Sequence, residues 1–181
     1  MIWIFLVALI VFPGRYDVAA LEAALGAFFS AMEFPANLHI RCAIYVPIKK
    51  GSKLEQITNY VPDGKSGKGH RLDSRAGIVG RAFRENKHWL ENLNDEKFSS
   101  SEYFLNDMVS RWGFTHEEAR KLTQDRRSYS ALVIKDESKV IIGILYSDCN
   151  SIEAFKTPEA FERAQKFVPF FTQLLKLRGS K

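Results

Sequence analysis

Two stretches of this 181-residue chain decide its fold class. The first is Ala76-Gly-Ile-Val-Gly-Arg-Ala-Phe83, which predicts a helix over 76–85. Its glycines permit close packing of the helix on the sheet, and a short strand is expected over 89–91. The second is Arg127-Ser-Tyr-Ser-Ala-Leu-Val-Ile134 with Lys139-Val-Ile-Ile-Gly-Ile-Leu-Tyr146, which predicts two strands of a hairpin. A helix, a short strand and a closing hairpin indicate a sheet with helices against it.

The flanking sequence adds helices at both ends and a first pair of strands. Asp17 caps a predicted helix that ends near Met32, and Thr157-Pro-Glu159 begins another that runs to about Leu177 with a kink at Pro169. Strands are expected over 38–48 and 54–61, followed by a loop over 62–69, and Ser74 is expected to cap the glycine-started helix. The polar segment 94–126 predicts two short helices, the first ended by Gly113 and the second begun by a Thr115–Glu118 capping box.

In this order, the elements over residues 17–177 resemble a GAF domain. The strongest matches are Gly77-Ile-Val-Gly80 and the Arg127-Ser128 start that leads to Ile142-Gly-Ile-Leu145. The resemblance implies an α+β fold, in which an antiparallel sheet carries the N- and C-terminal helices on one face and a ligand pocket on the other.

The resemblance also implies where a ligand would bind, since the insert and the last strands wall the pocket in this family. Candidate ligand-binding residues are Trp89, Phe98, Tyr103, Phe104, Trp112, Arg127 and Tyr129. Ordinary core packing is the alternative for each aromatic side chain.

No catalytic set, metal site or cofactor motif can be assembled from the sequence. The two cysteines, Cys42 and Cys149, exclude a disulfide framework and predict reduced thiols in a cytoplasmic domain. His39 and Cys42 lie on opposite faces of one strand, so they cannot share a metal ion. The chain also lacks the cysteine cluster of the GAF-type free methionine sulfoxide reductases, the cyclic GMP motif and a bilin-attaching cysteine.

These absences lead to a functional expectation. We expect a GAF-like sensory or regulatory domain that is not an enzyme, and that binds an undefined small ligand or mediates dimerisation in signalling. The alternatives are a GAF-scaffold enzyme acting on a small metabolite, and binding to nucleic acid or another anionic surface.

Anionic partners are suggested by a basic block over 49–87, which carries ten Lys and Arg against four Asp and Glu. A solvated loop face is the competing interpretation. Nucleic acid is disfavoured because Tyr60 is the only aromatic residue near the middle of the block that could stack on bases.

Residues 1–12 are apolar without a break and predict contact with a membrane, so we divide the chain into an anchor-like segment 1–14 and one domain over 15–181. Packing of this segment on the domain or on a second subunit is the alternative.

The terminal helices predict a homodimer. Apolar residues recur at coiled-coil spacing on the first helix, and a matching stripe follows the last one. The residues expected at the dimer interface are Val18, Leu21, Leu25, Phe28, Phe171 and Leu175. Packing of both helices within one subunit is the alternative.

Overall fold

The computed structural model describes residues 16–64, 67–93, 100–122, 124–155 and 157–177. Residues 1–12, for which membrane contact is expected, and Phe98 lie outside these ranges. Within the described ranges, no helix combines the length and the apolar character needed to cross a bilayer.

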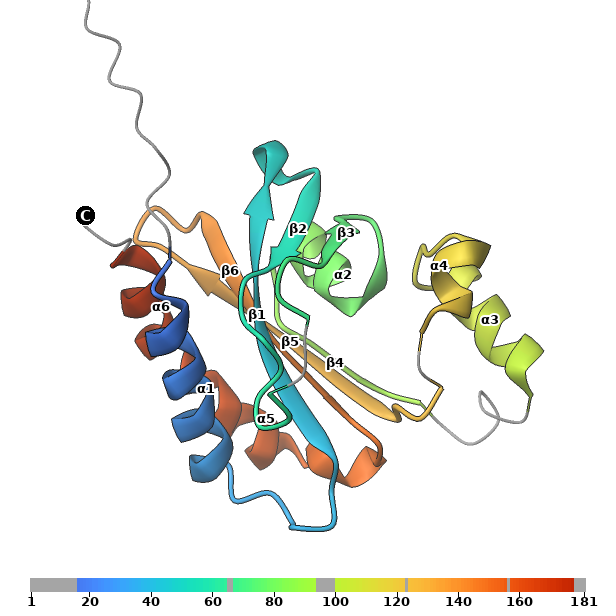
Figure 1. Ribbon diagram of the computed structural model, residues 1–181, viewed down its shortest axis with the longest axis horizontal. Helices are drawn as coiled ribbons and strands as arrows, with labels where there is room; N and C mark the ends of the chain where they lie inside the picture. Colours follow the sequence, from blue (N-terminus) through green and yellow to red (C-terminus); the bar gives the residue numbers. More distant parts are fainter. Residues whose placement is uncertain (1–15, 65–66, 94–99, 123, 156, 178–181) are drawn as a thin grey trace, which may run out of the picture.

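Six strands form one antiparallel sheet in the order β3-β2-β1-β6-β5-β4 (Figure 1). Their bounds are β1 Ile40–Ile48, β2 Lys53–Gln56, β3 Arg71–Asp73, β4 Trp89–Asn92, β5 Ser128–Lys135 and β6 Ile141–Cys149. The predicted hairpin is confirmed as β5 and β6, which pair along their whole length. The first strand of the fold, β1, lies beside the last, β6, so these two strands form the centre of the sheet.

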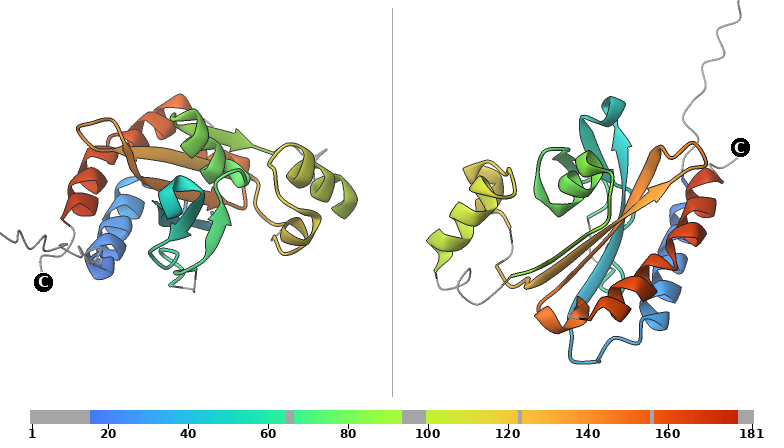
Figure 2. Two further views of the ribbon diagram at one scale, coloured as in Figure 1. Left: turned by 90° about the horizontal axis from the view of Figure 1, so that it is seen from above. Right: turned by 180° about the vertical axis from the view of Figure 1, so that it is seen from behind.

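Helices cover both faces of the sheet (Figure 2). Their bounds are α1 Val18–Ala31, α2 Gly77–Glu85, α3 Ser101–Ser110, α4 His116–Arg120, α5 Pro158–Gln165 and α6 Val168–Lys176, with short 3-10 turns at Lys49–Gly51 and Ile152–Phe155. The terminal helices α1, α5 and α6 lie on one face, and α2, α3 and α4 lie on the other side of the sheet (Figures 1 and 2). The α+β fold class and the placement of the terminal helices are therefore confirmed.

Alternation along the strands separates two hydrophobic cores. On β1, Cys42, Ile44 and Val46 face the terminal helices, whereas Ala43 and Tyr45 face α2. Because successive side chains of a strand point to opposite faces, one strand supplies both cores.

Several local predictions change in detail. The strand expected over 54–61 ends at Gln56, and the hydroxyl of Thr58 then accepts the N–H of Ile44 at 3.0 Å in place of a backbone carbonyl. A strand that was not predicted, β3, follows the loop expected over 62–69 and pairs with β2. The last helix breaks before Pro169 into α5 and α6, as expected of a residue without an N–H group.

The start of α2 also differs from the prediction. Ala76, not Ser74, is the N-cap residue, and it makes no side-chain capping bond. Gly77 follows with a φ of +67°, and its N–H donates to the carbonyl of Trp112 at 2.8 Å. A backbone with positive φ at this position favours glycine. The hydrogen bond from Gly77 ties the start of α2 to the loop after α3. The Thr115–Glu118 capping box of α4 is confirmed.

The expected dimer seam needs a correction. Five of its six residues are at most 2% exposed within one chain, namely Leu21, Leu25, Phe28, Phe171 and Leu175, while Val18 is half-buried. The ring of Phe28 packs edge-on against Phe167 and Phe171 at centroid distances of 5.2 and 6.3 Å. The seam therefore joins α1 to α6 and the sheet of the same subunit, which was the alternative. A homodimer through another surface stays a prediction.

Candidate functional site

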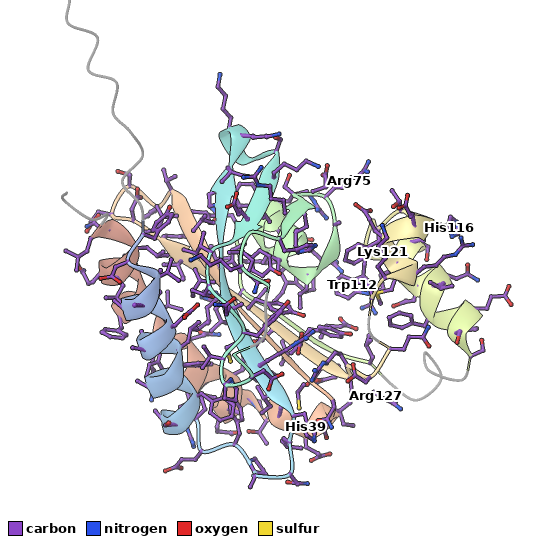
Figure 3. The ribbon with its side chains drawn as sticks, viewed as in Figure 1. His39, Arg75, Trp112, His116, Lys121 and Arg127 are labelled. Atoms are coloured by element: carbon purple, nitrogen blue, oxygen red, sulfur yellow. The ribbon has the colours of Figure 1, made fainter. Side chains whose placement is uncertain are left out.

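A cavity of about 160 Å³ lies between the sheet and the segment that contains α2, α3 and α4. Strands β1 and β6 contribute Arg41, Tyr45, Tyr146 and Asp148, which share the face opposite Cys42 and Ile44. The start of α2 and the loop after α3, which includes Trp112, form another wall (Figure 3). The cavity therefore occupies the sheet face on which the resemblance places a ligand pocket.

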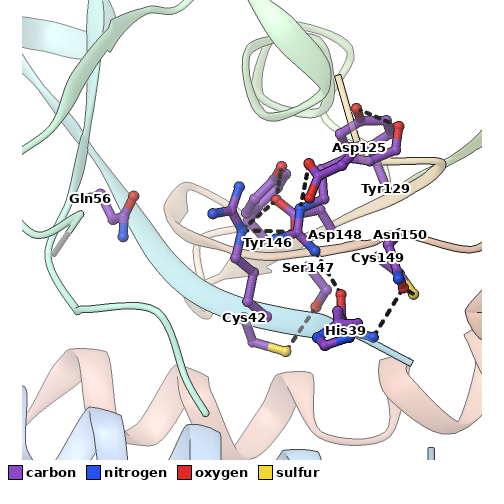
Figure 4. Close-up of polar contacts among 12 residues, drawn as sticks. His39, Cys42, Gln56, Asp125, Tyr129, Tyr146, Ser147, Asp148, Cys149 and Asn150 are labelled. Atoms are coloured by element: carbon purple, nitrogen blue, oxygen red, sulfur yellow. Dashed lines mark hydrogen bonds and ion pairs between the residues drawn. The ribbon is translucent and has the colours of Figure 1, made fainter. Parts of the chain in front are cut away.

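A fully buried carboxylate organises the charged part of this cavity. Nε of Arg41 donates to both oxygens of Asp148 at 2.9 and 3.0 Å, and the hydroxyl of Tyr146 donates to Asp148 Oδ2 at 2.7 Å (Figure 4). Nε of Arg126 lies 3.4 Å from Asp148 Oδ1, and its Nη1 donates to the carbonyl of His39 at 2.7 Å. Asp148 is 0% exposed, so it acts on the cavity through the side chains that it holds.

Burial sets the protonation of these groups. Desolvation lowers the pKa of Arg41, but the hydrogen bond and the charge of Asp148 outweigh it and raise the pKa above its ordinary value. Burial, and then the charge of Asp148, raise the pKa of Tyr146 well above its ordinary value. At neutral pH, Arg41 is thus a cation and Tyr146 is a neutral phenol with a proton to donate.

Aromatic side chains enclose the rest of the cavity. The guanidinium of Arg41 lies over the ring of Tyr60 at 4.2 Å from its centroid, and Tyr45 packs edge-on against Tyr146 at 5.9 Å. Trp112 and Phe114 contribute from the loop between α3 and α4. The site thus joins a charged floor to apolar walls, which is the common composition of a small-molecule pocket.

Six of the seven predicted ligand-binding residues lie in the described ranges, and two of these six, Trp112 and Tyr129, line the cavity. The hydroxyl of Tyr129 donates to the carbonyl of Arg126 at 3.1 Å, which fixes its ring beside the charged cluster.

The other four lie elsewhere. Trp89 stacks under the guanidinium of Arg81 at 3.8 Å, Phe104 is 1% exposed in the core, and Tyr103 is 59% exposed on the surface of α3. Arg127 precedes β5, where its N–H donates to the carbonyl of Cys149 at 2.7 Å. None of these four is among the residues that line the cavity.

Four ionisable residues of the cavity were not predicted from the sequence: Arg41, Arg126, Tyr146 and Asp148. A signal was present, because Arg41 and Asp148 are charged residues within otherwise apolar strands. Such residues are rarely buried without a partner. Their partnership could not be found, since it depends on the pairing of β1 with β6.

The thiols lie on the wrong face to act in this cavity. Cys42 and Cys149 belong to the core beneath the terminal helices, and both are 0% exposed. Burial raises the pKa of Cys42 to about 12, although the hydroxyl of Ser147 donates to its sulfur at 3.3 Å. Burial also raises the pKa of Cys149. Both are therefore neutral thiols of low reactivity.

Metal and nucleic-acid binding gain no support from the described part of the chain. It contains no group of three or more His, Cys, Asp or Glu side chains that could hold a metal ion. Five of the ten basic side chains of the 49–87 block are paired locally: Lys53 and Arg75 with Asp73, Arg71 with Glu55, and Arg81 and Lys87 with Glu85. The block therefore presents less unpaired charge than its composition predicts.

Comparison with known proteins defines the fold. No protein-family model matches the chain, and no curated protein sequence is similar to it. Among solved structures, it is similar to a type II free methionine-R-sulfoxide reductase from Thermoplasma acidophilum, with a TM-score of 0.62 and 13% identity over 89% of this chain and 93% of that one. It is similar to fRMsr of Staphylococcus aureus in complex with substrate, with a TM-score of 0.58 and 15% identity over 89% and 85%.

A sensory protein is also among the similar structures. The GAF domain of a two-component sensor histidine kinase from Bacillus halodurans has a TM-score of 0.59 and 9% identity, over 86% of this chain and 93% of that one. Together these structures show that the chain has a GAF-like fold, as the sequence resemblance implied.

The same comparisons correct the functional expectation. Several of the similar structures are free methionine-R-sulfoxide reductases, which are enzymes. The expectation of a non-catalytic sensory or regulatory domain is therefore wrong, and the alternative, a GAF-scaffold enzyme, is proposed in its place. The error arose because two absences from the sequence, the cysteine cluster and an acid–base constellation, were taken to exclude catalysis. The first bears on thiol chemistry alone.

Proposed function

We propose that this chain is a GAF-scaffold enzyme that binds a small metabolite in the cavity above Asp148 and removes a proton from that metabolite. The similar enzymes support the use of the scaffold for catalysis. The reaction class is inferred from the residues of this chain.

The observation that carries the proposal is the buried cluster of Arg41, Tyr146 and Asp148. Taking charged groups out of water is costly, and apolar side chains would stabilise a sheet face as well or better. Here the cluster lies in the wall of a cavity instead of inside a packed core. Ionisable groups that are buried, have specific charged partners and line a cavity are a common feature of active sites.

The hydrogen bonds favour a proton relay. Asp148 is 0% exposed, and Tyr146 connects it to the cavity through a 2.7 Å hydrogen bond. As the oxygen of Tyr146 accepts a proton from the substrate, its own proton passes to Asp148. The electron pair stays on the substrate, and the guanidinium of Arg41 stabilises the negative charge that develops there.

The thiols have no part in this reaction. Cys42 and Cys149 lie on the opposite face of the sheet from Tyr146, and their raised pKa values keep them protonated. Reduction of methionine sulfoxide by a cysteine nucleophile is therefore not what this site supports.

The proposal is tested by incubating the purified chain with a mixture of small metabolites in D₂O and following solvent deuterium incorporation and product formation by mass spectrometry. We expect turnover by the unaltered chain and its loss in Tyr146→Phe, which keeps the ring but breaks the relay. The matched control is Tyr103→Phe, because Tyr103 is 59% exposed outside the cavity. If Tyr146→Phe retained full turnover, the relay would be wrong.

A further inference from the structure

Two guanidinium groups and one carboxylate line the cavity. Among the described residues that line it, Arg41 and Arg126 are cations and Asp148 is the one anion among Asp and Glu side chains. Arg126 has a second carboxylate beside it, because its Nε lies 3.4 Å from Asp125 Oδ1, which offsets its charge. The guanidinium of Arg41 is therefore the positive group that faces a cavity with mostly apolar walls. In such surroundings a charge interacts more strongly with a ligand than it does in water.

Arg41 has donors available for that ligand. It binds Asp148 through Nε, and among the described residues its terminal Nη1 and Nη2 atoms find no hydrogen-bond partner. Contact with the ring of Tyr60 at 4.2 Å fixes the plane of the guanidinium. Its side chain is 22% exposed, so the terminal nitrogens can be reached. Two parallel N–H donors on a fixed plane match the two oxygens of a carboxylate.

The rest of the cavity fits an apolar group of modest size. Trp112, Phe114 and Tyr129 line it together with aliphatic side chains from α2 and β3. Its volume of about 160 Å³ is close to that of an apolar protein cavity of about 150 Å³ that holds benzene. A single ring or a branched aliphatic group fits beside the guanidinium.

We propose that the ligand is a small monocarboxylate with an aromatic or branched aliphatic body, whose carboxylate binds Nη1 and Nη2 of Arg41. A carboxylate brings one negative charge and two oxygens to this one guanidinium, whereas a phosphate monoester carries nearly two charges. The inference rests on the proposed function only in that both use the same cavity.

Thermal shift and calorimetry with matched probes test the ligand class. Benzoate, phenylacetate and 3-methylbutanoate are compared with the neutral benzamide and benzyl alcohol, and with phenyl phosphate. We expect at least one carboxylate to raise Tm and bind about tenfold or more tightly than its neutral counterpart, as one charge-assisted hydrogen bond provides. Equal binding of neutral probes, tighter binding of phenyl phosphate, or binding of none of the carboxylates would overturn the inference.

Variants tie that binding to Arg41. Arg41→Lys keeps the charge but removes the paired donors, and we expect about tenfold weaker binding. Should Arg41→Lys fail to fold, the double variant Arg41→Gln/Asp148→Asn removes both partners together, and it should lose the preference for carboxylate over amide. The matched control is Arg71→Lys, which alters an exposed ion pair with Glu55 outside the cavity. Retention of full carboxylate affinity in the Arg41 variants would refute the assignment.

The two proposals can fail separately. Carboxylates that bind through Arg41 but undergo no proton exchange would contradict the enzyme and leave the ligand class standing. Turnover that depends on Tyr146 but shows no preference for carboxylates would support the enzyme and contradict the ligand class.

Discussion

Arg41 and Asp148 are directly opposite residues on the neighbouring strands β1 and β6, although 107 positions separate them in the chain. Their side chains share the face that is covered by α2, and the ion pair between them lies in the wall of the cavity. One strand register thus creates the charged part of the candidate site.

Asp148→Asn should destabilise the protein, because it removes the carboxylate that two largely buried guanidinium groups share. Arg126 keeps Asp125 at 3.4 Å, so the loss falls mainly on Arg41. We expect a loss of about 3 kcal/mol in the free energy of unfolding by urea, near the lower end for breaking a buried pair because Arg41 keeps some exposure. The control is Glu55→Gln at the exposed pair with Arg71, where the loss should be below about 1 kcal/mol. Similar losses in both variants would show that the cluster is not effectively buried.

His88 should make stability depend on pH. Its Nδ1 accepts the N–H of Val133 at 3.0 Å, which requires a neutral ring nitrogen. Burial, and then the charge of Lys135, lower the pKa of His88 below 6.5 in the folded state. The unfolded chain therefore takes up this proton first as the pH falls below about 6.5. Its contribution to stability is complete above that pH and declines below it.

Thermal unfolding between pH 5 and 8 measures this effect. His88→Gln keeps a possible acceptor and should flatten the decline in Tm, whereas the exposed His116→Gln should leave the decline unchanged. An identical pH profile in His88→Gln and the unaltered chain would contradict the assignment.

Two helical glycines should respond to alanine in opposite directions. A Cβ at Gly80 would lie 2.5 Å from the backbone oxygen of Ser74, so Gly80→Ala should cost about 1–3 kcal/mol. Gly26 in α1 has nothing within 4 Å of that position, so Gly26→Ala should stabilise the protein by about 0.5–1 kcal/mol. Urea unfolding of the two variants is the measurement, and a change of the same sign in both would refute this explanation.

The thiols should be inert in the folded protein. Cys42 and Cys149 are 0% exposed with raised pKa values, so a thiol reagent such as Ellman's reagent should label them only after unfolding. The double variant Cys42→Ser/Cys149→Ser should keep the fold, ligand binding and turnover. A loss of turnover in that variant without a loss of fold would reverse the assignment of acid–base chemistry.

Residues 1–12 should bind the chain to lipid. Burying their apolar side chains would contribute several kcal/mol, at about 1.5–3 kcal/mol for each large one. Liposome flotation compares the full chain with one that begins at Asp17, and we expect flotation of the full chain alone. If neither chain floats and both stay monodisperse, the membrane prediction fails.

The sequence by itself determined the fold class. The glycine-started segment that becomes α2, the β5–β6 hairpin, the capping box of α4 and the break at Pro169 are local features, and all four are present. Local features of this kind depend on residues a few positions apart, so a single sequence contains the information that specifies them.

Only the tertiary structure decided the site and the partners of the terminal helices. The apolar stripes on α1 and α6 are equally compatible with a second subunit or with each other, and the choice depends on the sheet face that both helices cover. Similarly, Arg41, Arg126 and Asp148 belong to three separate segments that meet because β1 and β5 both pair with β6. A charged side chain in a strand shows that a partner is required, but strand register and topology, which are long-range properties, determine which partner it meets.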